Sequence, residues 1–122
     1  MCDIGKIKIQ RIYDEPSDND GYRVLVDRLW PRGISKKSAN LNEWNKEIAP
    51  SPELRKWFDH KKERFGEFAR LYRMELKEKE GLLNELRQAA KHETVSLLYA
   101  AKNPEINHAV VLKEVLLKDH NL

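Results

Sequence analysis

Tyr22–Gly33 reads YRVLVDRLWPRG, and this stretch decides the fold of the chain. It opens with an apolar, largely β-branched run directly after a glycine, a pattern typical of a strand. Asp27 and Arg28 stand where that strand should end, and the proline and glycine that follow predict a stiff bend. Ligands of open α/β sheets bind beyond the carboxyl ends of the strands. The sequence therefore predicts the functional site at this strand end.

Three other segments carry features of strands. Lys6–Tyr13 alternates polar and apolar side chains, and Thr94–Tyr99 is a short apolar run. Leu41–Ile48 is compatible with an irregular strand or a short helix, and we favour an edge strand. Asp14–Gly21 consists of turn-forming residues, so it separates the first strand from the strand of Tyr22–Asp27.

Helical patterns fill much of the remaining chain. Ser51 is a good N-cap, with Pro52 at the first helical position. We expect Asp59 to cap the next helix, because aromatic and apolar residues recur at helical spacing over 65–76. A third helix is predicted over roughly Gly81–Lys91. The segment 34–39, by contrast, is predicted to be a basic loop.

The last third of the chain combines a strand, a short loop and a helix. We expect Asn103 to cap a helix that begins at Pro104 and runs to about Lys118. At such a helix start, unpaired N–H groups and the helix dipole face the preceding loop, which is an anion-binding geometry. His108 lies in the first turn of this helix, on its inward-facing apolar line.

Short apolar strands followed by helical segments predict an α/β fold. We expect a single three-layer domain over residues 1–122, with a short, mostly parallel sheet flanked by helices. A chain of 122 residues is long enough to bury about two-thirds of its unfolded surface. The net charge of +3 and the pI near 9.0 indicate a mildly basic protein. That balance allows phosphate or nucleic-acid partners without requiring them.

Cysteine use and hydropathy suggest the compartment. Cys2 is the single cysteine of the sequence, which favours a reducing environment. No apolar stretch approaches the roughly 18 residues of a membrane span, and Met1–Gly5 lacks the form of a signal peptide. We therefore expect a cytoplasmic protein without a membrane partner. No cofactor motif or metal-ligand spacing occurs, so we expect neither a cofactor nor a metal, and the oligomeric state stays open.

Two groups of polar residues should converge if the strand at Tyr22 and the strand at Thr94 are parallel neighbours. Asp27 and His108 are candidates for an acid–base pair. The candidates for ligand binding carry guanidinium, ammonium, amide and indole groups: Arg28, Trp30, Arg32, Lys102 and Asn107. Structural roles are the alternative for each residue. Asp27 can cap a turn, Trp30 can pack, and His108 can donate to a backbone carbonyl.

Three stretches carry a family resemblance: GYRVLVDRLWPRGISKK, EIAPSPELRKWFDH and TVSLLYAAKNPEINHAVVLKEVL. They resemble the YeaO-like proteins, small bacterial proteins in a domain-of-unknown-function family, over nearly the whole chain. The resemblance implies no established activity. More distant relatives carry a cysteine near the start of the loop after the last strand and a Cys-His-Arg triplet at the helix start. In this chain Tyr99 or Ala100 occupies the position of that cysteine, and the triplet is Asn107-His108-Ala109. Only the histidine is therefore shared.

The strand–loop–helix arrangement also invites comparison with rhodaneses and cysteine phosphatases. Their chemistry needs a thiolate activated at a helix N-terminus, usually with an arginine that closes the loop. The loop after Tyr99 has neither residue. We therefore expect Cys2→Ser to leave any ligand binding or activity unchanged.

Three classes of function stay open, and we rank them. The first is a module that binds a small phosphorylated or carboxylated ligand. The second is an enzyme that uses Asp27 and His108 without thiol or metal, with Arg28 stabilising an anion. The third is a nucleic-acid or protein interaction domain that uses Trp30 and the basic loop beginning at Arg32. The 20 acidic residues beside 23 basic ones count against nucleic acid without excluding it.

Overall fold

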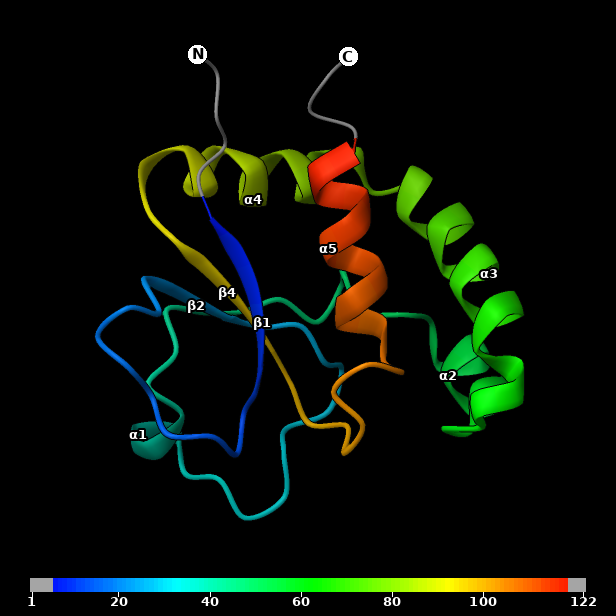
Figure 1. Ribbon diagram of the computed structural model, residues 1–122, viewed down its shortest axis with the longest axis horizontal. Coiled ribbons are helices and arrows are strands. Elements are labelled where there is room, and N and C mark those ends of the chain that lie inside the picture. Colours follow the sequence, from blue (N-terminus) through cyan, green and yellow to red (C-terminus); the bar gives the residue numbers. More distant parts are fainter. Residues whose placement is uncertain (1–5, 119–122) are drawn as a thin grey trace.

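The computed structural model describes residues 6–118, so Cys2 lies outside the described part (Figure 1). The described residues form four strands, five α-helices and one 3-10 turn. In chain order these elements are β1 (Ile7–Arg11), β2 (Tyr22–Leu25), α1 (Lys36–Ala39), β3 (Glu43–Trp44), α2 (Pro52–Phe58), η1 (Lys62–Arg64), α3 (Phe65–Lys77), α4 (Glu80–His92), β4 (Val95–Tyr99) and α5 (His108–Lys118).

The four strands form one sheet in the order β1-β4-β2-β3, and every neighbouring pair is parallel. β4 lies between β1 and β2, with Leu97 opposite both Ile9 and Val24. The pairing of β2 continues past its end, since the N–H of Val26 donates to the carbonyl of Leu98 at 3.0 Å. The predicted parallel sheet and the predicted edge strand are confirmed. Because all strands run the same way, their carboxyl ends meet at one edge of the sheet.

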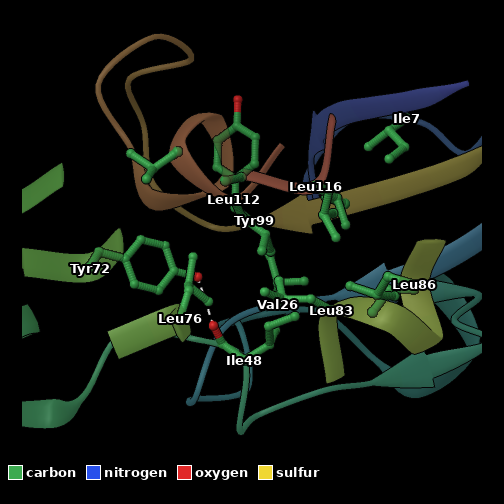
Figure 2. Packing of buried hydrophobic residues seen from close by; sticks show 14 of the residues in the cluster. Ile7, Val26, Ile48, Tyr72, Leu76, Leu83, Leu86, Tyr99, Leu112 and Leu116 are labelled. Carbon is green, nitrogen blue, oxygen red and sulfur yellow. Dashed lines mark hydrogen bonds between the residues drawn. The ribbon is translucent and has the colours of Figure 1, made fainter. Parts of the chain in front are cut away.

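Alternation along the strands divides the core between the two faces of the sheet. Val24, Val26, Leu97 and Tyr99 belong to the larger core, which they form with apolar side chains of α2–α5 (Figure 2). The residues between them, Leu25 and Leu98, belong to a smaller core with Ala39 of α1. The fold is therefore the predicted α/β domain, with one face covered by four helices and the other by α1 and its flanking segments.

α5 is the helix that ties the larger layer to the sheet. It contacts β1 and β4 directly and packs against α3 and α4 (Figure 1). Ala109, Val111, Leu112 and Leu116 are its buried residues. Within the described residues, no helix has both the length and the apolar character needed to cross a membrane.

One predicted helix start is correct here, and two other predictions are wrong. The Ser51 hydroxyl accepts from the N–H of Leu54 at 3.2 Å, so it caps α2 as expected. Asp59 does not begin the next helix. It ends α2 in a left-handed conformation with φ of 49°, which aspartate tolerates better than most residues, and η1 then leads into α3. The segment predicted to be a basic loop contains the one-turn helix α1, capped by the hydroxyl of Ser35.

The last helix starts later than predicted. Asn103 accepts from the N–H groups of Glu105 and Ile106, at 2.8 and 3.1 Å, and this closes a turn rather than starting a helix. Asn107 is the residue that caps α5, because its Oδ1 accepts from the N–H of Val110 at 3.1 Å. The prediction failed because an asparagine before a proline caps a turn and a helix equally well. His108 is therefore the first residue of α5.

A buried ion pair closes the amino end of β2. Asp20 and Arg23 are 1% and 2% exposed, and Nη1 of Arg23 donates to Oδ2 of Asp20. Nη2 and Nε of Arg23 donate to the carbonyls of Ala39 at 2.8 Å and Asn40 at 3.0 Å. Nζ of Lys8 lies 2.6 Å from Oδ1 of Asp20. This pair links β1, β2 and the end of α1, a structural role that the turn-like sequence around Asp20 does not reveal.

Candidate functional site

Asp27 follows β2 at the carboxyl edge of the sheet and contacts two other segments. Its Oδ2 accepts from the N–H of Ala100, just after β4, at 2.9 Å. Its Oδ1 lies 2.9 Å from Nε2 of His108, at the start of α5. Both side chains are mostly enclosed, with 16% and 15% of their surface exposed. The structure thus brings the predicted acid–base candidates together.

His108 also has the structural contact that the sequence allowed, a hydrogen bond to a backbone carbonyl. Its Nε2 lies 2.8 Å from the carbonyl oxygen of Val26, as well as close to Asp27. A carbonyl and a carboxylate are both acceptors, so Nε2 carries a hydrogen in either charge state of the ring. The aromatic ring of Tyr72 meets the imidazole edge-on, with 6.2 Å between ring centroids. His108 therefore holds the end of β2 against α5 whether or not it also meets a ligand.

Arg28 donates to the segment that leads into α2. Its Nε donates to the carbonyl of Pro50 at 2.8 Å, and its Nη2 donates to the carbonyl of Ala49 at 3.4 Å. The preceding carbonyl, that of Ile48, accepts from the hydroxyl of Tyr72 at 2.7 Å (Figure 2). Lys79 donates to the carbonyls of Glu47 and Ala49. Side chains thus hold four successive carbonyls, 47–50, in place.

Electrostatics around this segment follow from burial. Burial raises the pKa of the Tyr72 hydroxyl well above its usual value, and the nearby Glu75 and Asp27 carboxylates add to the effect. Burial lowers the pKa of the Lys79 ammonium, and the charge of Arg28 lowers it further. Glu75 accepts from the N–H and the hydroxyl of Ser51, at 2.9 and 2.6 Å. The stretch EIAPSPELRKWF is therefore anchored to α3 and to the end of β2.

The other predicted ligand residues are separated by the structure. Nε1 of Trp30 donates to the carbonyl of Ile34 at 2.6 Å, and its ring packs edge-on against Trp44. Arg32 is exposed at the bend after β2. Asn107 is 1% exposed, and its amide caps α5. Their contacts with a ligand stay predictions.

A cavity of about 590 Å³ opens at the carboxyl ends of β1 and β4. Of the predicted site residues, Lys102 lines it, whereas Asp27, Arg28 and His108 do not. The lining also includes polar, charged and apolar side chains from β1, from the segment after it and from the loop after β4: Ile9, Gln10, Arg11, Asp14, Glu15, Tyr99 and Pro104.

Arg11 is a residue of the cavity lining that sequence reasoning missed. It ends β1, opposite Tyr99, which ends β4. Its Nε donates to the carbonyl of Ala101 at 3.0 Å, and its guanidinium lies 5.1 Å from the centroid of the Tyr13 ring. The rule that selected Arg28, a charged side chain at the end of a strand, also applies to Arg11. That rule would have found it.

The buried Tyr99 also lines this cavity. Burial raises the pKa of its hydroxyl, the positive charge of Arg11 opposes that shift, and the negative charge of Asp14 adds to it. A hydrogen bond with Asn107 also lowers this pKa. Charges of both signs therefore act on one buried hydroxyl.

A second cavity, of about 830 Å³, lies at the amino ends of the strands. Lys8 lines it, but this ammonium pairs with the buried Asp20. Over residues 6–118, no three His, Cys, Asp or Glu side chains gather closely enough to hold a metal ion.

The chain is similar to known proteins over nearly its whole length. Residues 6–121 match the model of a family described as "Inactive DUF488-N3 subclade". The chain belongs to this family. It is 47% identical over 110 residues to the uncharacterized protein YeaO of Escherichia coli (strain K12). This match covers 90% of the chain and 96% of YeaO. The YeaO-like resemblance is thereby confirmed.

Two uncharacterized mycobacterial proteins are similar to the chain as well. The chain is 40% identical over 111 residues to the uncharacterized protein Rv3073c of Mycobacterium tuberculosis (strain ATCC 25618 / H37Rv) and, equally, to Mb3100c of Mycobacterium bovis. Each match covers 91% of the chain and 93% of the relative. No solved structure matches the chain significantly.

Proposed function

We propose that this protein binds a small carboxylated or phosphorylated ligand in the cavity at the carboxyl ends of β1 and β4, without transforming it. The observation that carries the proposal is the presence of two cations, Arg11 and Lys102, in the lining of this cavity. Within residues 6–118, neither side chain lies in an ion pair with a carboxylate. A ligand anion is the natural partner for both.

The position and the chemistry of the two cations support this proposal. Ligands of open parallel sheets bind outside the carboxyl ends of the strands, where this cavity lies. Arg11 is held at one nitrogen by the carbonyl of Ala101, and the rest of its planar fork suits an oxyanion. An exposed ion pair contributes up to about 1 kcal/mol, so we expect millimolar binding of a simple anion that weakens as salt is added.

The family description supports binding over catalysis. The matched subclade is described as inactive, and the relatives named above are uncharacterized. In this chain Asp27 and His108 already hold backbone groups of Ala100 and Val26. Both residues have a structural role that requires no substrate.

Acid–base catalysis is a second candidate, favoured by one observation. Nε2 of His108 lies 2.9 Å from Oδ1 of Asp27, a geometry in which a carboxylate orients an imidazole. The substitution Asp27→Asn tests this role. Under the binding proposal it leaves ligand affinity within about twofold of the native value, because the cavity lining does not include Asp27.

The binding proposal is tested by NMR titration of the ¹⁵N-labelled protein with inorganic phosphate and with acetate. We expect backbone amide shifts around Arg11 and Lys102 that saturate with one dissociation constant. Arg11→Gln should weaken binding about fivefold, the effect of losing about 1 kcal/mol. Arg55→Gln is the matched control, since it removes the same charge from an exposed side chain on α2, outside the cavity lining.

Two results would contradict the proposal. One is a set of shifts confined to Arg28 and residues 106–108, which would move the anion to the start of α5. The other is an equal loss of affinity in the Arg11 and Arg55 variants, which would reduce the effect to net charge.

A further inference from the structure

We infer that the ligand of this cavity is zwitterionic: a small molecule that carries an ammonium group as well as its carboxylate or phosphate. The inference rests on the proposed function and narrows its ligand class. The anionic group would bind between Arg11 and Lys102, and the ammonium group would bind to Asp14 and Glu15. All four side chains line the same cavity.

The cavity lining contains two positively charged and two negatively charged side chains. Arg11 and Lys102 are positive, and Asp14 and Glu15 are negative. Among the described residues, these four form no ion pair with one another or with any other side chain. The lining is therefore neutral overall. A simple anion would gain from the two cations and be repelled by the two carboxylates, whereas a zwitterion would meet a partner for each of its charges.

Hydrogen bonds fix the wall that carries both carboxylates. The N–H of Asp14 donates to the carbonyl of Arg11 at 3.0 Å, which turns the chain directly after β1. The side chain of Gln10 donates to the carbonyl of Glu15 at 3.2 Å. The chain at Asp14 and Glu15 is thereby kept next to the end of β1, and neither carboxylate lies within ion-pair distance of Arg11.

The segment that carries Lys102 is fixed as well. Asn103 closes the turn that follows Lys102, and the side-chain amide of Asn107 donates to the carbonyl of Asn103 at 2.8 Å. Pro104 lines the cavity beside Lys102. Both segments are thus held by bonds within the fold, so the cavity is formed before a ligand arrives.

Besides its charged side chains the cavity offers apolar contact. Ile9, Pro104 and the buried Tyr99 are part of its lining. Arg11 and Asp14 shift the pKa of the Tyr99 hydroxyl in opposite directions, so charges of both signs act on this lining residue. A short carbon chain between the two charged groups of a ligand would lie over this part.

The test compares zwitterions with anions of the same length by NMR titration. The pairs are glycine with acetate, β-alanine with propionate and γ-aminobutyrate with butyrate, and butylammonium serves as the cation alone. We expect at least one zwitterion to bind about fivefold more tightly than its matched anion, with shifts at Arg11, Asp14 and Lys102. Butylammonium should bind more weakly than γ-aminobutyrate.

Substitution of the acidic wall provides the second arm. In the double variant Asp14→Asn with Glu15→Gln, the preference for the zwitterion should disappear while the matched anion binds as well as before or better. The double variant Asp18→Asn with Glu63→Gln is the control, because it removes two exposed carboxylates that do not line this cavity. The control should keep the preference.

The outcomes separate this inference from the proposed function. If every zwitterion binds with the affinity of its matched anion at Arg11, the zwitterion inference is overturned and anion binding stands. If neither class shifts the amides around Arg11, both proposals are overturned. A preference that survives the Asp14 and Glu15 substitutions would also overturn the inference.

Discussion

The two ends of β2 each carry an acidic side chain beside a basic one, yet the two pairs have different surroundings. At the amino end, Asp20 and Arg23 are almost fully buried, and backbone carbonyls accept the remaining guanidinium donors. At the carboxyl end, Asp27 and His108 keep about a sixth of their surface exposed. Partner number and burial, rather than charge type, therefore separate a structural pair from a candidate site.

The comparison predicts a large loss of stability at the amino end. Arg23→Met removes one partner of a buried ion pair and leaves Asp20 buried with Lys8 as its remaining ion-pair partner among residues 6–118. We expect the free energy of unfolding to fall by about 3 kcal/mol in urea titrations. Arg55→Met, at an exposed position on α2, should change it by less than about 0.5 kcal/mol. Equal effects of the two substitutions would mean that the buried pair is not a structural element.

A smaller loss is predicted at the carboxyl end. In Asp27→Asn the amide oxygen can still accept from the N–H of Ala100, but the amide nitrogen then faces the protonated Nε2 of His108. We expect the free energy of unfolding to fall by about 1–2 kcal/mol, with the circular dichroism spectrum unchanged. A loss as large as that of Arg23→Met would erase the distinction between the two ends of β2.

Acid should weaken the amino end selectively. Burial by itself raises the pKa of Asp20, but hydrogen bonds from Lys8, Ser17 and Arg23 outweigh it, and the pKa lies below the usual 3.8. A carboxyl group with a lowered pKa in the folded state stabilises the fold above its unfolded pKa, and this contribution is lost as the pH falls through the folded pKa. The ¹³C shift of the Asp20 carboxyl should therefore titrate below pH 3.8. A midpoint above that value would contradict the account of this end.

The smallest predicted effect concerns Tyr22, where β2 meets β3. The hydrogen bond to Glu43, at 2.8 Å, together with burial raises the pKa of Tyr22 to about 12. Because the folded state favours the neutral hydroxyl, its contribution to stability is present below about pH 10 and is lost as the pH rises towards 12. Absorbance titration of the native protein against Tyr22→Phe isolates this tyrosine. In Glu43→Gln its midpoint should return towards 10.0; an unchanged midpoint would show that Glu43 is not the cause.

Local signals predicted most of the fold. Alternation over Lys6–Tyr13 and apolar runs at the other strands are properties of a few neighbouring residues, so they can be seen in the sequence. Asn103 and Asp59 misled because their short polar side chains also stabilise turns and left-handed residues. Whether such a residue begins a helix or closes a turn depends on contacts with residues distant in the sequence.

Only those contacts of the candidate site that follow from the sheet topology could be predicted from the sequence. Parallel strands bring their carboxyl ends together, which is why Asp27 and His108 meet. The partners of Arg28 are the carbonyls of Ala49 and Pro50, more than 20 residues away, and no local pattern indicates them. The ion pair of Asp20 was hidden for a similar reason, since its sequence neighbours form turns.

The central claim is that the anion binds in the cavity between Arg11 and Lys102 rather than beside Asp27 and His108. The most direct test is a crystal structure of the native protein with selenate, a phosphate-sized oxyanion that the anomalous signal of selenium locates without ambiguity. The account predicts an anomalous peak within hydrogen-bonding distance of both Arg11 and Lys102. A peak at the start of α5 near Arg28, or peaks only among the lysines at the amino ends of the strands, would contradict it.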